Sequence, residues 1–260
     1  MTMFDVLGAI ELTASAAILV SAMALGLRVG GWARFQLAAC LAGWFGVVVA
    51  LAATEALSRR QGIGAAGMGL VVFLPVVVLW AALLRLPSLR ADLERVPLAL
   101  LVGVHAVRVL GVSFLILHAR GRLPAPFAPV AGWGDILVGA FALPVAYLVT
   151  RQGPNWRTAL WAWNVLGLAD LIAAVTLGVL SSPGPLRMIF AEPGSGVMST
   201  LPWLLIPGFI VPLLAVLHLS IFRRLMKGEM GIRGAGPAGT ETFHTGLAGS
   251  TGGRGERATA

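Results

Sequence analysis

The sequence predicts an all-α membrane protein, a bundle of seven transmembrane helices with the N-terminus outside and the C-terminus in the cytoplasm. Of its 260 residues, 58% are hydrophobic and only 12% are charged, and the mean hydropathy is +0.89. A soluble domain carries about 25% charged residues to keep its surface hydrated. The apolar residues form stretches of about 20, the length with which a helix crosses the hydrocarbon core. These stretches, such as residues 70–84, are apolar at every position, whereas barrel strands alternate.

Seven windows of this length predict the spans. In chain order they cover residues 4–27, 35–57, 63–84, 96–118, 127–149, 158–180 and 201–222. The first window is expected to be a retained helix and not a secretory signal, because no Lys or Arg precedes Arg28 and Glu11 interrupts the apolar run. Three prolines, Pro124, Pro126 and Pro129, stiffen the connection before the fifth window and fix where that helix begins.

Two segments outside the spans differ from the short connections. The connection over residues 181–200 contains an apolar patch, Leu186 to Ala191, and is expected to lie on the membrane and cap the bundle. After Lys227 the composition changes, because residues 228–260 contain 10 glycines and few residues that a core would bury. We therefore expect residues 1–227 to form the transmembrane domain and residues 228–260 to be a disordered cytoplasmic tail.

The basic residues predict the orientation. Cytoplasmic loops of membrane proteins carry the excess of Lys and Arg. The connections on the side of the N-terminus hold five basic residues: Arg59, Arg60, Arg120, Arg122 and Arg187. The other side holds eleven: Arg28, Arg34, Arg85, Arg90, Arg95, Arg151, Arg157, Arg223, Arg224, Lys227 and Arg233. The net charge of +8 thus faces lipid headgroups and not nucleic acid. Trp32, Trp80, Trp156 and Trp203 lie near span ends and are expected to be headgroup anchors.

Ionisable residues inside the spans indicate a site. Glu11, Arg108, Asp135 and Asp170 fall in four different spans, and a charged side chain at the bilayer centre costs about 2.5–3.5 kcal/mol. At 1.5 Å per residue, these four lie roughly 10 to 15 Å below the outer surface. His105, Asn164 and His218 form a second layer, roughly 20 to 25 Å deep. Four spans contributing charge at one depth suggest that these residues meet.

Helical spacing predicts how they meet. His105 and Arg108 are three residues apart, and Asn164 and Asp170 share a stripe with Gly167 between them. Glycines at similar spacing flank Asp135 and let a neighbouring helix approach. We expect the fourth, fifth and sixth spans to pack together with Arg108 held between Asp135 and Asp170, because one guanidinium can bind two carboxylates.

This cluster leaves two interpretations open. It is either a structural ion pair that fixes helix register, with His105 and Asn164 hydrogen-bonded across the bundle, or a binding and ion-coupling site. The second interpretation rests on charge, since Arg108 offsets only one of three carboxylates. Prolines give it further support, because they leave backbone carbonyls without a hydrogen bond near membrane depth: Pro75, Pro144, Pro202, Pro207 and Pro212. It predicts ion- or proton-linked movement of a small solute, with the site residues Arg108, Asp135, Asp170, His105, Asn164 and Glu11.

Other chemistries remain as alternatives or are excluded by the sequence. His105 and His218 are candidate axial ligands of a b-type haem. An enzyme acting on a lipid would use His105 with Asp135 or Asp170 as acid and base. The spans contain no lysine for a retinal Schiff base, the chain has no HExxH, GxSxG or Walker motif, and Ser113 has no evident base beside it. We therefore expect a protein without a cofactor and without enzymatic activity. It is expected to be a multi-pass protein of a bacterial inner membrane, and its partners are the bilayer and an unknown small solute or ion.

Overall fold

A computed structural model describes residues 2–26, 31–57 and 64–234, and every regular element in these ranges is helical. The elements are α1 (Met3–Gly26), α2 (Gly31–Ala53), α3 (Gly64–Arg85), α4 (Pro87–Arg95), α5 (Leu98–Gly103), η1 (Val104–Gly111), α6 (Val112–Ala119), α7 (Phe127–Arg151), α8 (Trp156–Leu180), η2 (Gly196–Ser199), η3 (Ile206–Ile210) and α9 (Val211–Gly234). Seven helical segments are long and apolar enough to cross a membrane, with α5, η1 and α6 together forming the fourth and η3 with α9 the seventh. The predicted helical class and the number of such segments are confirmed for the described residues.

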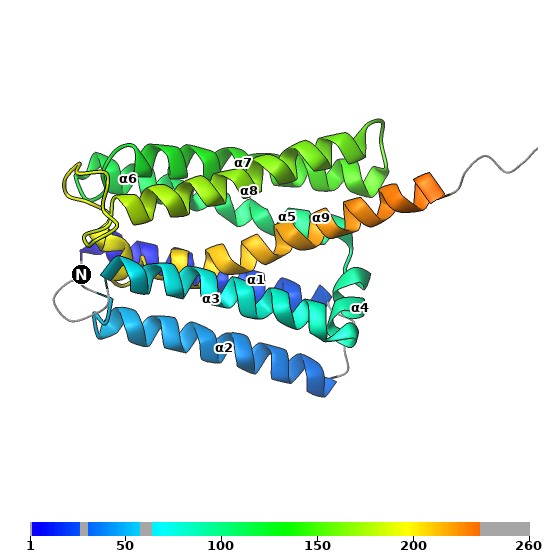
Figure 1. Cartoon of the computed structure of the whole chain (residues 1–260), viewed down its shortest axis with the longest axis horizontal. Helices are drawn as coiled ribbons and strands as arrows, with labels where there is room; N and C mark the ends of the chain where they lie inside the picture. The colour runs from blue at the N-terminus through cyan, green and yellow to red at the C-terminus, as the bar shows by residue number, and fades with distance from the viewer. Residues whose placement is uncertain (1, 27–30, 58–63, 235–260) are drawn as a thin grey trace, which may run out of the picture.

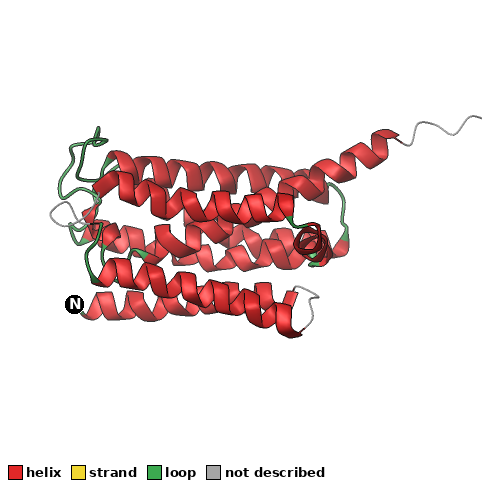
Figure 2. Ribbon diagram, turned by 60° about the horizontal axis from the view of Figure 1, so that its bottom comes forward, coloured by secondary structure: helices red, strands yellow, loops and turns green. Residues whose placement is uncertain are grey.

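The bundle is arranged around α9. Figure 1 shows α7 and α8 on one side and α2 and α3 on the other, with α1 and α9 between them, and Figure 2 shows the long helices running alongside one another with the loops at the two ends. In the seventh segment, 67% of the apolar stretch is buried inside the protein, whereas in the second segment the buried share is 17%. The last apolar segment is therefore the centre of the fold, and α2 lies at its periphery.

Two segments near the core depart from α-helical hydrogen bonding. η1 is a 3-10 helix of eight residues in the middle of the fourth segment, and η3 is a π-helix that begins the seventh and contains Pro207. Stretches of 3-10 helix longer than three or four residues are uncommon, and π-helical turns occur often at functional sites. Both irregular segments pack against α1.

The sequence did not predict α4, which lies across the end of the bundle opposite the start of α1 (Figure 1). Pro87 occupies its first turn, where a missing N–H costs nothing. Glu94 of α4 pairs with Lys227 and Arg223 of α9, and the hydrogen bond from Lys227 holds the pKa of Glu94 below its usual range. Arg224 donates to the carbonyl of Val96 at 2.6 Å. These contacts fix the short helix to α9.

The start of α1 is held by a buried carboxylate. Asp5 accepts hydrogen bonds from Arg122 at 2.7 Å and from the indole of Trp203 at 3.0 Å. Trp203 is fully buried and stacks on Phe4 with ring centroids 5.3 Å apart. The expectation that Trp203 anchors in the headgroups was therefore wrong, because a partner for its N–H exists inside the protein.

The structure describes the connection over residues 181–200 completely but only the start of the expected C-terminal tail. The connection over residues 181–200 covers the bundle end where α1 begins, and its Met188 and Phe190 are 73% exposed. Its place on a membrane surface remains a prediction. α9 runs to Gly234, past the expected start of the tail at residue 228, and residues 235–260 of the expected tail lie outside the described residues.

Candidate functional site

Arg108 is the centre of a buried polar cluster formed by η1, α7, α8 and α9. Its Nε donates to Asp135 Oδ1 at 2.7 Å, and its Nη2 donates to Asp170 Oδ2. Its Nη1 donates to the carbonyl of Gly167 at 3.2 Å and to His218 Nε2 at 3.2 Å. The Arg108 side chain is 1% exposed, while those of Asp135 and Asp170 are 17% and 11% exposed. The expected placement of Arg108 between the two aspartates is found.

The hydrogen bonds of His218 determine its protonation. Because a guanidinium can only donate, the Nε2 of His218 must accept from Arg108 and carries no proton. The proton is then on Nδ1, which donates to Asn164 Oδ1 at 2.8 Å. Asn164 in turn donates to the backbone carbonyl of His218 at 3.1 Å. His218 is therefore neutral in this arrangement, and adding a second proton would break its contact with Arg108.

Glycines in α7 and α8 allow the charged groups to come together. A Cβ at Gly139 would lie 2.5 Å from the backbone nitrogen of Val109, so η1 rests directly on α7 at this residue. Gly134 leaves the space that the Asp170 carboxylate occupies, and Gly167 leaves the space for the His218 ring. The stripes of small residues thus allow close approach of the helices, as they commonly do in membrane proteins.

His105 lies beside the cluster but outside its hydrogen-bond network. Its ring centroid is 4.1 Å from that of His218 and 5.2 Å from that of Trp163. It is fully buried, and neither ring nitrogen has a hydrogen-bond partner among the described residues. The hydrogen bond across the bundle that we expected of His105 is therefore not found, and its contacts are with rings.

Glu11 lies on the other side of Arg108, across a small cavity. The Ser113 hydroxyl lies 3.0 Å from both carboxylate oxygens of Glu11. The interpretation that no base lies beside Ser113 was wrong, because α1 supplies one from 102 residues away in sequence. A cavity of about 40 Å³ separates Glu11 from Arg108 and Asp135. Each buried water needs roughly 10–15 Å³ of such space, so the cavity can hold a few waters or a small ion.

The structure joins the two layers that the depth estimate separated. Arg108 contacts Asp135 and Asp170 of the outer layer and His218 of the deeper layer. The sequence placed His218 in the deeper polar layer and named it as a candidate haem ligand; in the structure it belongs to the charged cluster through Arg108 and Asn164. No spacing pattern in the sequence indicates the Ser113 contact or the Gly167 carbonyl.

Haem ligation between His105 and His218 would need a different arrangement. The iron lies between its two axial nitrogens with the porphyrin plane separating the rings. Here the two rings are in contact, so they would have to move apart to admit the group. Within the described residues, no three His, Cys, Asp or Glu side chains are grouped so that they could hold a metal ion.

Comparison with known proteins gives a family but no activity. A family model described as Domain of unknown function (DUF8737) matches residues 65–226. The matched segment contains Arg108, Asp135, Asp170, His105 and His218, whereas Glu11 lies outside it. No curated protein and no solved structure matches the chain.

Proposed function

The chain belongs to the family described as Domain of unknown function (DUF8737), and we propose that its buried polar cluster serves the ion- or proton-linked movement of a small solute across a bacterial inner membrane. Seven helices capable of spanning a membrane supply the setting for such a function. The cluster lies on four of those segments and contacts a fifth, α1, across the cavity. Its partners would be the bilayer and the transported solute.

A surplus of negative charge carries this proposal. Arg108 is shared by Asp135 and Asp170, and it offsets one of them. The carboxylate of Glu11 contacts the Ser113 hydroxyl, which brings no charge. A surplus carboxylate in a low-dielectric interior must take up a proton, bind a cation or contact water. Each of these is a step that an ion-coupled site uses.

The irregular helices supply a means of changing shape. η1 carries Arg108, and η3 lines the cavity through Ile206 and Ile210. Transporters commonly place their sites at interrupted helices near the middle of the membrane. A change between 3-10 and α geometry in η1 would rotate Arg108 relative to Asp135, and the pairing of the carboxylates would change with it.

Proteoliposomes test this function. Vesicles that contain the protein and a trapped pH-sensitive dye are exposed in turn to sodium, amino acids, carboxylates and amines. We expect one class to change the internal pH, and Asp135→Asn or Asp170→Asn to abolish that change. Glu192→Gln is the matched control, because Glu192 is a carboxylate at the surface with a side chain 74% exposed. A wild-type protein that gives no response to any class would leave the cluster as a structural ion pair.

An absorption spectrum tests the haem alternative. Since the His105 and His218 rings are in contact, we expect the purified protein to be colourless. A stoichiometric Soret band that disappears in His218→Ala would instead establish a b-type haem and overturn the transport proposal.

A further inference from the structure

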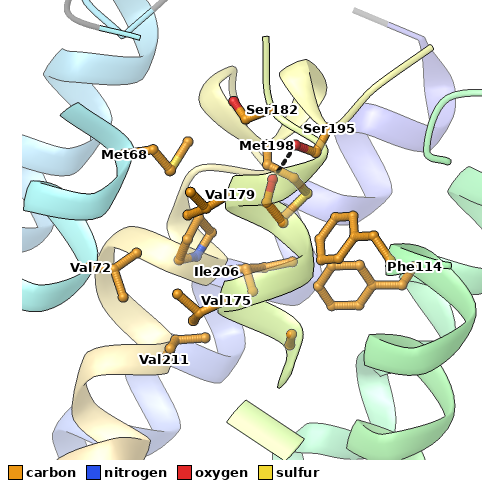
Figure 3. A pocket seen from close by; sticks show the side chains of 14 residues that line it. Met68, Val72, Phe114, Val175, Val179, Ser182, Ser195, Met198, Ile206 and Val211 are labelled. Carbon is orange, nitrogen blue, oxygen red and sulfur yellow. Dashed lines mark hydrogen bonds between the residues drawn. The ribbon is translucent and has the colours of Figure 1, made fainter. Parts of the chain in front are cut away.

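A second cavity adjoins the polar one. It has a volume of about 50 Å³ and is lined by apolar side chains from α3, α6, α7, α8 and α9, with Phe114 opposite Met68 and Val72 (Figure 3). The connection over residues 181–200 covers it through Ser182, Ser195 and Met198. Ser195 is held in place by its hydroxyl, which donates to the carbonyl of Gly178 at 2.6 Å.

The two cavities share one wall. Phe114, Ile206 and Val211 line both the apolar cavity and the polar cavity that contains Glu11. These three side chains make apolar contacts alone, so rotating Phe114 or Ile206 breaks no side-chain hydrogen bond. Ile206 begins the π-helix, where backbone hydrogen bonding already departs from the α-helical pattern. Movement of this wall would join the cavities into one elongated space, apolar at one end and charged at the other.

The charges at the polar end select a cation. The guanidinium of Arg108 already donates four of its five N–H groups to two carboxylates, a carbonyl and His218, so its charge is offset within the protein before any anion arrives. Glu11 lines the cavity without a cationic partner among the described residues. The charged groups that face Glu11 across the cavity are Arg108 and Asp135. The elements α2 and η3 also contact α1, but they contribute no charged side chain to the cavity lining.

We propose that the joined cavity binds a small alkylammonium ion and that this class of amine is the transported solute. This inference rests on the proposed function. The ammonium group contacts Glu11 and Asp135, and the short hydrocarbon chain enters the apolar cavity. Cavities of about 50 and 40 Å³ restrict the ligand to a short chain, since the pockets that bind drug-sized ligands measure about 300–1,000 Å³. A proton held by the Glu11 carboxyl is released to solvent when the ammonium takes its place, and this exchange would couple amine movement to proton movement.

Four small probes test this class in the purified, detergent-solubilised protein. They are n-butylammonium, methylammonium, n-butanol and butyrate, which are too short to form micelles. Burying one methylene group is worth roughly 0.8 kcal/mol, or about a fourfold change in Kd, so butylammonium should bind roughly 50-fold more tightly than methylammonium. Butanol and butyrate should bind at least about tenfold more weakly than butylammonium, because each lacks the positive charge. Equal binding of butanol and butylammonium would overturn the proposal.

Variants connect this binding to the two cavities. Glu11→Gln should weaken butylammonium binding at least about tenfold and abolish proton release in weakly buffered solution. Glu192→Gln, the surface control, should change neither. Ile206→Ala thins the shared wall and should shift the preferred chain length upward by one or two carbons; Val211→Ala should do the same if Ile206→Ala fails to fold. An unchanged chain preference in a folded wall variant would contradict the joined cavity.

The two proposals fail in different ways. Glu11-dependent butylammonium binding without any movement in proteoliposomes would support the site and contradict the transport function. If the protein transports another solute in a manner that depends on Asp135 and Asp170 and does not bind butylammonium, the transport function is supported and the proposal of an amine as the solute is overturned.

Discussion

At the scale of single residues, Arg108 determines the chemistry of the interior. Four of its five N–H donors are directed at Asp135, Asp170, Gly167 and His218, so most of its hydrogen bonds are made inside the protein. Removing one partner of a buried charge pair costs more than removing both, because the remaining charge is left in a low-dielectric environment. The interaction is therefore best measured by a double-mutant cycle.

We predict non-additive effects around Arg108. Arg108→Ala should lower stability in detergent, and adding Asp135→Asn or Asp170→Asn should recover part of the loss, with a coupling free energy of about 0.5–3 kcal/mol. Neither double variant should recover function, which proteoliposome assays would measure. The control is the surface pair Arg95 and Asp92, where Arg95 is 62% exposed and coupling should be about 0.2–1 kcal/mol at most. Additivity at both aspartates would contradict the hydrogen bonds seen here, and full activity in a stable double variant would mark the cluster as structural.

At the scale of elements, the contact between η1 and α7 sets the position of Arg108. The backbone of η1 passes over Gly139, where a Cβ would lie 2.9 Å from the carbonyl carbon of Arg108 and 2.5 Å from the nitrogen of Val109. Because both neighbours are backbone atoms, no side-chain rotation can relieve such a contact. The helix would have to move away from α7 and from Asp135.

We predict that Gly139→Ala destabilises the protein although alanine favours helices. Overpacking of this kind costs about 1–3 kcal/mol. Gly46→Ala in α2 is the matched control, because a Cβ there meets nothing within 4 Å, and it should be neutral or stabilising by up to about 1 kcal/mol. Reversible unfolding in mixed micelles measures both changes. A Gly139→Ala protein as stable as Gly46→Ala would show that η1 does not rest on α7.

At the scale of the whole molecule, α1 begins at one end of the bundle and α9 ends at the other (Figure 1). This is the geometry of an odd number of crossings. The end where α9 finishes holds α4 with Arg90, together with Arg223, Arg224 and Lys227 of α9. Because cytoplasmic loops of membrane proteins carry the excess of Lys and Arg, we predict that this end is the cytoplasmic one.

We predict that a reporter fused after Lys227 is cytoplasmic, while the same reporter inserted after Arg122 is periplasmic. Paired alkaline phosphatase and fluorescent protein fusions measure this. Periplasmic activity from the Lys227 fusion would contradict the predicted orientation, and the end of the polar cluster assigned to the outer side would then lie on the cytoplasmic side.

The amino-acid sequence alone predicted the helical class, the seven apolar segments and the meeting of Arg108 with Asp135 and Asp170. The physical reason is that membrane-spanning length and the cost of buried charge are local properties, readable from composition and from helical spacing of a few residues. The same spacing does not report whether a turn is α or 3-10, so η1 and η3 were not expected. α4 was missed because nine residues are too few for a span.

Only the tertiary structure decided which side chains from distant helices share one environment. Glu11 meets Ser113 across 102 residues, Asp5 removes Trp203 from the surface, and Phe114, Ile206 and Val211 divide two cavities. Each of these contacts depends on how helices rotate about their axes and approach one another. In an almost uniformly apolar sequence, side-chain packing sets that rotation, and no hydrophobic period marks one face of a helix as the inner one.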